Sequence, residues 1–177
     1  MTLAFRPASP ADVPAVVDLV NAAYRGDSSR AGWTTEADLL DGARITASEL
    51  EALISAEGST VLLCLQDGAL AGCVHLKRLE DGKAYLGLFT VRPGLQGGGL
   101  GKAFLAEAEA TVRRLWNTRT MTMTVITLRA ELLAYYERRG YRRTGVVKPF
   151  PRESAETRPR VEGLLLEVLE KDLGGNP

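Results

Sequence analysis

A glycine-rich segment is the part of the sequence whose residue types most clearly could bind a ligand. Residues 92–101 read RPGLQGGGLG. An apolar stretch expected to be a strand precedes the segment, and an amphipathic stretch expected to be a helix begins at Leu100. Unpaired backbone N–H groups at a helix N-terminus attract negative charge, and glycines let a phosphate approach the backbone closely. The segment therefore predicts an anion-binding loop.

The spacing within this loop excludes two common nucleotide-binding motifs. A Walker A loop would need a glycine where Gln96 stands and a hydroxyl residue, the ligand of Mg²⁺, where Ala103 stands. A G-x-G-x-x-G dinucleotide loop would need a glycine at position 102 or 104, which hold lysine and phenylalanine. The pattern that remains is Q-x-x-G-x-G, formed by Gln96, Gly99 and Gly101.

Two segments resemble the GNAT superfamily of acetyl-CoA-dependent N-acyltransferases. The sequence YLGLFTVRPGLQGGGLG resembles the pyrophosphate-binding loop of that superfamily and the strand before it. Residues 132–141, LLAYYERRGY, resemble its late helix, in which Tyr, Glu, two variable residues, Gly and an aromatic residue recur, beginning here at Tyr136. The spacing from Gln96 to Tyr136 is also typical of the superfamily. The resemblance implies the GNAT fold and acetyl-CoA as cosubstrate.

The resemblance also implies a role for individual residues. The loop residues implied to bind the cofactor are Gln96, Gly97, Gly98, Gly99, Leu100, Gly101 and Lys102. By the same resemblance, Phe89, Thr90 and Val91 are expected to form the strand edge that pairs with pantetheine, where a free N–H would polarise the acyl carbonyl. Arg129 stands where many members carry Asn, and its guanidinium can reach a phosphate. Tyr136 is the expected acid for the departing thiolate, because a phenol is protonated at neutral pH.

The attacking amine must lose a proton, and the sequence leaves the base open. Many relatives carry a Glu on the strand before the loop, but residues 85–91 contain no carboxylate. Glu36 is the preferred candidate, with Glu80, His75 and a chain of water molecules as alternatives. Trp33 lies near Glu36 in an acidic segment, and an aromatic ring with carboxylates suits a cationic amine. Trp33 and Glu36 are therefore the expected substrate-binding residues, although Trp33 could instead pack beneath its loop.

Hydrophobic periodicity predicts the elements that position these residues. The expected helices cover about residues 11–24, 47–56, 100–116 and 129–139. The expected strands cover about residues 2–6, 59–66, 70–79, 83–91, 120–128, 141–147 and 164–169. Residues 25–46 and 148–163 are polar, with glycines in the first and prolines in the second, and are expected to be loops. Long irregular segments in compact domains are often functional.

The order of these elements predicts the fold class. The pairs Asp67-Gly68 and Asp81-Gly82 are hairpin signals, so residues 59–91 are expected to form an antiparallel meander. A helix–strand–helix–strand unit follows it. We therefore expect an α/β (α+β) protein with a mixed, mostly antiparallel sheet of about seven strands and helices on both faces, which is the GNAT fold. A chain of 177 residues is expected to be one domain, residues 1–177.

Composition excludes several classes of protein. Hydrophobic residues make up 45% and charged residues 25% of the chain, which are ordinary globular values. No apolar run approaches the roughly 18 residues that span a bilayer, and no signal peptide is expected. The two cysteines, Cys64 and Cys73, lie in apolar runs and are too few for a disulfide scaffold or a metal site. A cytoplasmic location is therefore expected, without a membrane partner or a metal.

Charge is balanced overall but unevenly distributed. Residues 1–80 hold 6 basic and 11 acidic side chains, whereas residues 81–177 hold 16 and 11. Nucleic acid is not expected as a partner, because its binders usually show a basic excess over the whole domain. The basic residues between Arg138 and Arg160 are interpreted as solvated charge, as a site for an anionic ligand, or as a docking site for a macromolecular acceptor.

The sequence therefore predicts an acyltransferase of EC 2.3.1 type, an N-acetyltransferase. It would transfer an acetyl group from acetyl-CoA to a primary amine of a small molecule or peptide by direct attack. The alternative is a non-catalytic acyl-CoA-binding or regulatory protein of the same fold, which the lack of a carboxylate in residues 85–91 supports. An edge strand near the C-terminus favours a homodimer.

Overall fold

The computed structural model describes residues 1–25, 36–151, 158–160 and 162–174. The helices are the 3-10 turn η1 (Pro10–Asp12) and the α-helices α1 (Val13–Tyr24), α2 (Ala47–Ser55), α3 (Leu100–Trp116) and α4 (Ala130–Glu137). The strands are β1 (Leu3–Pro7), β2 (Leu40–Asp41), β3 (Ser59–Gln66), β4 (Ala69–Arg78), β5 (Ala84–Val91), β6 (Thr120–Ile126), β7 (Arg142–Pro149), β8 (Arg158–Pro159) and β9 (Leu165–Asp172). The expected helices and strands are present with small shifts of their ends.

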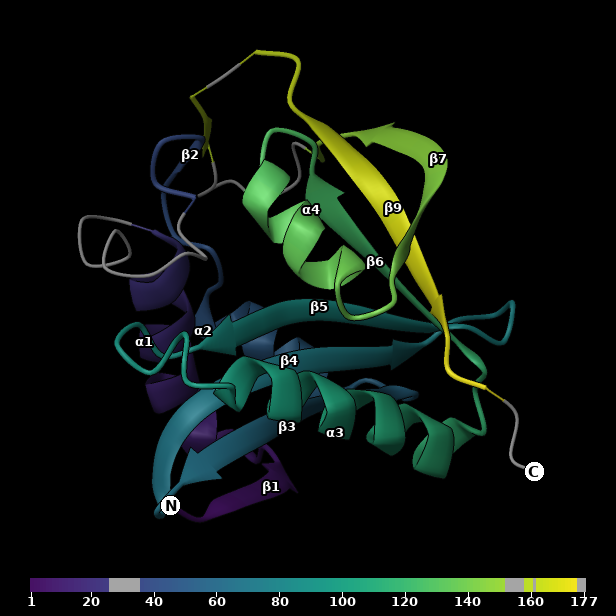
Figure 1. The fold of residues 1–177 in the computed structure, drawn as a ribbon. Helices are drawn as coiled ribbons and strands as arrows, with labels where there is room; N and C mark the ends of the chain where they lie inside the picture. The colour runs from purple at the N-terminus through teal and green to yellow at the C-terminus, as the bar shows by residue number, and fades with distance from the viewer. Residues whose placement is uncertain (26–35, 152–157, 161, 175–177) are drawn as a thin grey trace.

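Seven of the strands form one sheet, shown in Figure 1. Their order is β1-β3-β4-β5-β6-β9-β7, and each neighbouring pair is antiparallel except β5 and β6. This confirms the predicted mixed, mostly antiparallel sheet. The last strand, β9, lies between β6 and β7, so β7 is one edge of the sheet and β1 is the other. The periodicity of the sequence did not indicate this insertion, because it describes each strand without its neighbours.

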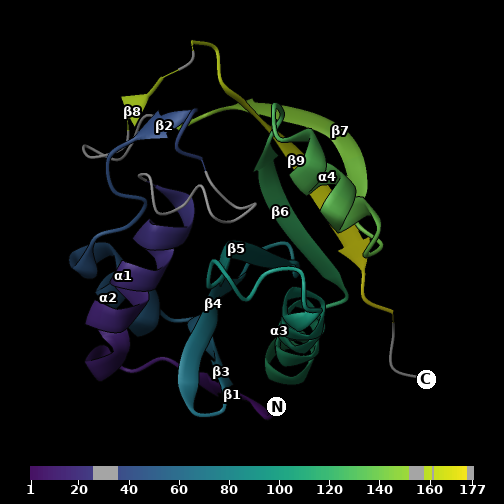
Figure 2. The same ribbon diagram turned by 60° about the vertical axis from the view of Figure 1, so that its left-hand side comes forward.

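The prediction that residues 25–46 and 148–163 are only loops was wrong in part. The two-residue strands β2 and β8 lie in these segments and pair antiparallel. Arg160 adds a backbone hydrogen bond from its N–H to the carbonyl of Leu39, at 2.7 Å. Leu40 packs with Ile126 and Leu164, which anchors this ribbon beside the end of β6 (Figure 2). Two-residue strands are too short to show a periodic pattern.

Helices cover both faces of the sheet, as expected. On one face, α1 and α2 pack against the meander, with Val16 and Leu50 buried beside Leu88 of β5. On the other face, α3 and α4 enclose a larger core that contains Phe104 and Leu133. The two predicted free thiols, Cys64 and Cys73, are buried and unbridged. None of the helices in the described ranges is both long and apolar enough to span a lipid bilayer.

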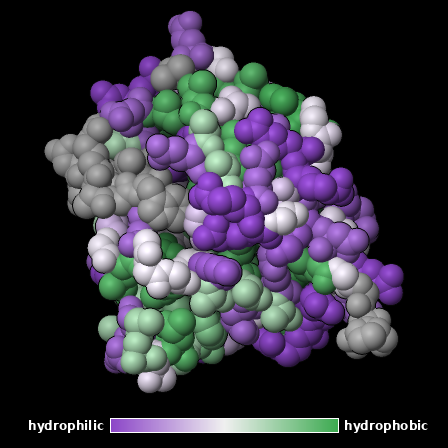
Figure 3. Space-filling view, in the orientation of Figure 1, coloured by the Kyte–Doolittle hydropathy of each residue, from purple (hydrophilic) through white to green (hydrophobic). Residues whose placement is uncertain are grey.

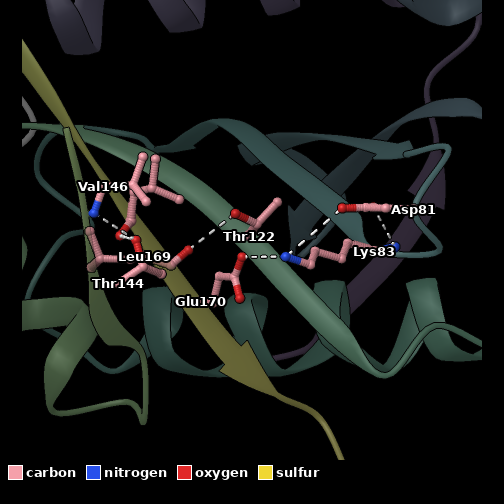
Figure 4. Close-up of polar contacts among 8 residues, drawn as sticks. Asp81, Lys83, Thr122, Thr144, Val146, Leu169 and Glu170 are labelled. Atoms are coloured by element: carbon pink, nitrogen blue, oxygen red, sulfur yellow. Dashed lines mark hydrogen bonds and ion pairs between the residues drawn. The ribbon is translucent and has the colours of Figure 1, made fainter. Parts of the chain in front are cut away.

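Strands β5 and β6 are joined at one end and diverge at the other. Their parallel pairing is limited to Ala84 with Met121 and Tyr85 with Thr122. Near this joined end the Lys83 Nζ lies 2.7 Å from the Glu170 Oε1 of β9, and the Thr122 hydroxyl donates to a β9 carbonyl (Figure 4). Residues 86–91 of β5 have no partner in β6, so the edge of β5 is open there.

A bulge in β5 lies within this open stretch. Leu88 has a φ of +51°, a left-handed conformation that is uncommon for a residue with a side chain. The register between β4 and β5 shifts between Cys73 and His75, opposite the bulge. As a result, Leu88 faces the α1–α2 core and Phe89 faces the α3–α4 core. Bulges of this kind redirect side chains beside functional sites.

Candidate active site

Two cavities lie at the open end of β5, on either side of α4. Cavity A has a volume of 640 Å³ and is lined by α1, α2, the segment before α2, strands β4, β5 and β6, and α4. Cavity B has a volume of 590 Å³ and is lined by the end of β5, the glycine-rich loop, the start of α3, and α4. Tyr136 lines cavity A, whereas its neighbour Tyr135 lines cavity B. Helix α4 therefore separates the two cavities.

The glycine-rich loop forms one wall of cavity B. Gly97 and Gly99 have φ values of +91° and +83°, which favour glycine. Gly99 caps α3 with no side-chain hydrogen bond, and the first turn of α3 carries no acidic residue. A Cβ atom at Gly101 would lie 2.7 Å from the Tyr135 hydroxyl oxygen. The loop therefore brings bare backbone close to the cavity at the positive end of a 17-residue helix.

Five of the seven predicted loop residues line cavity B, and two do not. Gln96, Gly97, Gly99, Gly101 and Lys102 line cavity B, and Gln96 also donates from Nε2 to the carbonyl of Val91 at 2.9 Å. That bond ties the loop to the end of β5. The other two predicted residues are not part of this lining: residue 98 is an exposed glycine, and residue 100 is a leucine buried in the α3–α4 core.

Two arginines that the sequence did not assign to the cofactor also line cavity B. Arg138 and Arg139 face the glycine-rich loop together with Lys102, and Glu131 is the acidic residue of the wall. The Arg139 guanidinium stacks on the Tyr135 ring at 3.5 Å from its centroid. In Figure 3 a large hydrophilic area lies over α4. The signal in the sequence was their spacing of three and four residues from Tyr135, which places both on the same side as Tyr135, just beyond the end of α4.

The predicted edge residues lie where β5 is open. Val91 and Thr90 pair with β4, and the Thr90 hydroxyl donates to the Leu88 carbonyl at 2.9 Å inside the bulge. The Phe89 carbonyl accepts a hydrogen bond from the Tyr24 hydroxyl of α1. The edge of β5 that faces away from β4 therefore meets cavity A at Phe89, next to Tyr24 of α1.

Tyr136 is held between aromatic rings. Its own ring centroid lies 6.4 Å from that of Phe89 and 5.7 Å from that of Tyr141, and only 5% of the residue is exposed. Burial raises the pKa of Tyr136 well above 10, and the neighbouring Tyr24 adds to the effect. The phenol therefore carries its proton at neutral pH, in a wall of cavity A.

Glu36 and Arg129 form one buried ion network instead of lying in separate sites. The Glu36 carboxylate lies 3.1 Å from the Arg25 guanidinium and 3.7 Å from that of Arg129. The side chains of all three residues are at most 11% exposed, and all three line cavity A. Arg129, which the sequence predicted to bind the cofactor, therefore lines cavity A and is not in the lining of cavity B.

We expect Glu36→Gln to lower the free energy of unfolding by about 2–4 kcal/mol, because it leaves two buried guanidinium groups facing a neutral amide. Chemical denaturation of the variant and the parent measures this difference. Glu137→Gln is the matched control, since Glu137 pairs with Arg143 at the surface and should cost less than about 1 kcal/mol. Equal effects of the two substitutions would contradict the importance of the buried network.

The alternative bases occupy different places. His75 lines cavity A, where its Nε2 lies 2.8 Å from the Ser59 hydroxyl. Since that hydroxyl donates to the Leu53 carbonyl, Nε2 must carry the ring proton. Burial lowers the pKa of His75 to about 4, so the ring is neutral at pH 7. Glu80 is exposed in the turn between β4 and β5 and does not line cavity A.

Two other expectations concern the acceptor and metals. The predicted contact of Trp33 with a substrate falls outside the described residues. Among the residues that are described, no group of three or more His, Cys, Asp or Glu side chains could hold a metal ion.

Comparison with known proteins gives both a family and a fold. Residues 15–141 match the model of the acetyltransferase (GNAT) family. No curated protein matches the chain in sequence. The ribosomal-protein-S18-alanine N-acetyltransferase from Escherichia coli is similar in structure, with a TM-score of 0.72 and 14% identity over 99% of this chain and 97% of that one.

Two further solved structures share the fold. A protein from Salmonella typhimurium, assigned as an acetyltransferase and solved with its cofactor acetyl-CoA, has a TM-score of 0.69 and 18% identity over 100% of this chain and 97% of that chain. A chimeric spermidine N-acetyltransferase built from Vibrio cholerae and hSSAT sequences has a TM-score of 0.70 and 14% identity, covering 98% and 96% of the two chains.

Proposed function

Since the chain belongs to the acetyltransferase (GNAT) family, we propose that it transfers an acetyl group from acetyl-CoA to a primary amine of a small molecule or peptide. The observation that supports this proposal best is the junction of the two cavities. The open edge of β5 runs from the glycine-rich loop of cavity B to Phe89 in cavity A. One cavity can therefore hold the cofactor while the other admits the acceptor.

The residues of cavity B fit the anionic part of acetyl-CoA. Bare backbone at Gly97 and Gly99 leads into the N-terminus of α3, and Lys102, Arg138 and Arg139 add positive charge. When bound, acetyl-CoA supplies the acyl thioester. We assign the loop from Gln96 to Lys102 to its diphosphate, with residue 98 and residue 100 contributing backbone N–H groups only, and the edge at Phe89, Thr90 and Val91 to its pantetheine arm.

The chain's own groups supply the remaining chemistry. A backbone N–H on the open edge of β5 can stabilise negative charge on a carbonyl oxygen, an effect worth about 3 kcal/mol at one donor. Tyr136 holds a proton on its phenolic oxygen in the wall of cavity A and is the acid that we assign to the leaving sulfur. The packed rings around Tyr136 fix its direction.

The base that removes the amine proton is not fixed by this arrangement. Glu36 as the base stays a prediction, and its two ion pairs favour a second role, the orientation of Arg25 and Arg129. His75 is a weak base because burial lowers its pKa to about 4. The assignment of Arg129 to the cofactor also stays a prediction.

Release of free thiol from acetyl-CoA tests the proposed function. The assay covers polyamines, amino acids, aminoglycosides and peptide N-termini, and calorimetry with coenzyme A measures cofactor binding separately. Transfer to any amine supports the proposal. Binding of coenzyme A without transfer would favour the non-catalytic alternative, and no binding at all would reject both.

The expected homodimer has one candidate surface. Every residue of β7 is exposed, and Val146 and Val147 are each 49% exposed at this sheet edge. However, Thr144 and Val146 form a bulge in β7, in which the Thr144 hydroxyl bonds to the Val168 carbonyl and accepts from the Val146 N–H (Figure 4). Bulges discourage the addition of a further strand. A dimer through β7 would therefore pack side chains, and sedimentation of a Val147→Glu variant tests it.

The cytoplasmic location also stays a prediction.

A further inference from the structure

The wall of cavity A contains an arginine whose charge no described carboxylate offsets. Arg44, in the segment before α2, lines the cavity and is partly buried. No ion pair joins Arg44 to an acidic side chain within the described ranges. Its guanidinium carbon lies 5.6 Å from the centroid of the Tyr24 ring. An arginine stacked on an aromatic ring keeps its N–H donors directed outward, in the plane of the guanidinium group.

The backbone that carries Arg44 is fixed to α1. The Asn21 side chain accepts from the backbone N–H groups of Arg44 and Ile45, at 2.7 and 3.2 Å, and donates to the carbonyl of Ile45 at 3.0 Å. Asn21 thus uses both ends of its amide on two consecutive residues. These hydrogen bonds hold the backbone at Arg44 in place. A binding group requires such a fixed backbone behind its side chain.

Two acidic side chains among the described residues line cavity A, Glu36 and Glu49, and both have partners of their own. The Glu36 carboxylate lies between Arg25 and Arg129. The Glu49 carboxylate accepts from the backbone N–H of Thr46 at 2.8 Å and from its hydroxyl at 3.1 Å, and so caps α2. A polycationic acceptor would therefore meet guanidinium groups whose like charge opposes it, whereas an anionic group would find an available donor.

Tyr24 sets the distance between the two ends of such an acceptor. Its ring lies beneath Arg44, and its hydroxyl donates to the Phe89 carbonyl on the open edge of β5. The Arg44 guanidinium and the strand edge that we assign to the thioester therefore lie against the same tyrosine side chain. An amine that attacks at this edge can have an anionic group on Arg44 only if the two lie a few bonds apart.

We propose that the acceptor is a small amine with a carboxylate close to its amino group, as in an amino acid, and that Arg44 binds the carboxylate. This proposal rests on the proposed function and specifies its substrate class. It replaces the cationic acceptor that the acidic segment around Trp33 suggested. A charge-assisted pair between guanidinium and carboxylate supplies both affinity and orientation.

Matched pairs of L-amino acids and their carboxamides, compared at equal concentrations of the free amine, test the proposal, since the two share side chain and stereochemistry and differ in the charge at the carboxyl group. The parent chain should acetylate the preferred amino acid with a kcat/KM about 10- to 100-fold above that of its carboxamide. Arg44→Gln should reduce this ratio to near one, and Arg44→Lys should restore part of it. Arg113→Gln, which removes the same charge from the exposed end of α3, is the control and should keep the full ratio.

A second measurement separates this proposal from the proposed function. Thermal shifts of the parent chain with coenzyme A, in the presence of an amino acid or its carboxamide, report acceptor binding without turnover. Stabilisation by amino acids but not by their carboxamides supports the role of Arg44, even if no acetyl transfer occurs and the proposed function fails. Transfer or binding that does not distinguish acids from carboxamides would overturn the role of Arg44 and leave the proposed function intact. This comparison also decides the question if Arg44→Gln does not fold.

Discussion

Replacing Tyr136 by phenylalanine should lower kcat by about 100- to 1,000-fold and leave the affinity for coenzyme A unchanged. The substitution removes only the phenolic oxygen, and one well-placed general acid typically contributes 10²–10⁴-fold. The ring, which packs between Phe89 and Tyr141, is retained, so the wall of cavity A should keep its shape. Steady-state kinetics with a saturating acceptor, together with calorimetry for coenzyme A, measure the two quantities separately.

The neighbouring tyrosine provides the control for this prediction. Tyr135→Phe removes a hydroxyl that faces cavity B, so it should change the KM for acetyl-CoA and leave kcat within a few-fold. The dependence on pH gives an independent check. Because burial raises the pKa of Tyr136 well above 10, the phenol keeps its proton as the pH rises, and kcat should not fall between about pH 7 and about pH 9. A Tyr136→Phe variant with nearly full kcat would assign the acid to another group or to water.

Reversing the charge at Lys102 should weaken binding of coenzyme A by about 100-fold without loss of stability. Two unit charges 4 Å apart interact by about 1 kcal/mol even in water, and Lys102→Glu changes the charge beside the diphosphate by two units. The same glutamate lies in the first turn of α3, where a negative charge interacts favourably with the helix dipole and stabilises the helix. Calorimetry and thermal unfolding should therefore respond in opposite directions, with affinity falling and stability equal to or above that of the parent.

Ala103→Glu tests whether the position of the charge matters. Residue 103 is exposed in the same turn of α3 but does not line cavity B, so this variant should gain the same helix stabilisation and lose little affinity. The affinity of Lys102→Gln for coenzyme A should lie between that of the parent and that of Lys102→Glu. If Lys102→Glu bound coenzyme A as tightly as the parent, cavity B would not be the diphosphate site. Equal losses for both glutamates would indicate a general electrostatic effect.

The two kinds of prediction differ in what they depend on. The loss of affinity expected at Lys102 follows from a local arrangement of glycines and a helix N-terminus, which residues adjacent in the sequence supply. The loss of kcat expected at Tyr136 depends on two walls brought together by the fold, since Tyr136 is on α4 and the strand edge that it faces is on β5.

The amino-acid sequence by itself determined the local elements and the glycine-rich loop that forms one wall of cavity B. Periodicity predicted the four helices and the strands of the main sheet, and glycine spacing predicted the loop at the start of α3. These features depend on residues close together in the chain, whose backbone preferences and apolar faces act within a few turns or strand lengths. The family resemblance followed from two such local segments, around Gln96 and Tyr136.

Only the tertiary structure decided which distant residues share a cavity. It placed β9 inside the sheet, paired β2 with β8, joined Arg129 to Glu36, and turned Arg138 and Arg139 toward the glycine-rich loop. It also placed Arg44 over Tyr24, the contact from which we propose an acceptor amine with a carboxylate. These contacts join residues far apart in the chain, and their pairing is fixed by the packing of whole elements. No pattern within a single element carries that information.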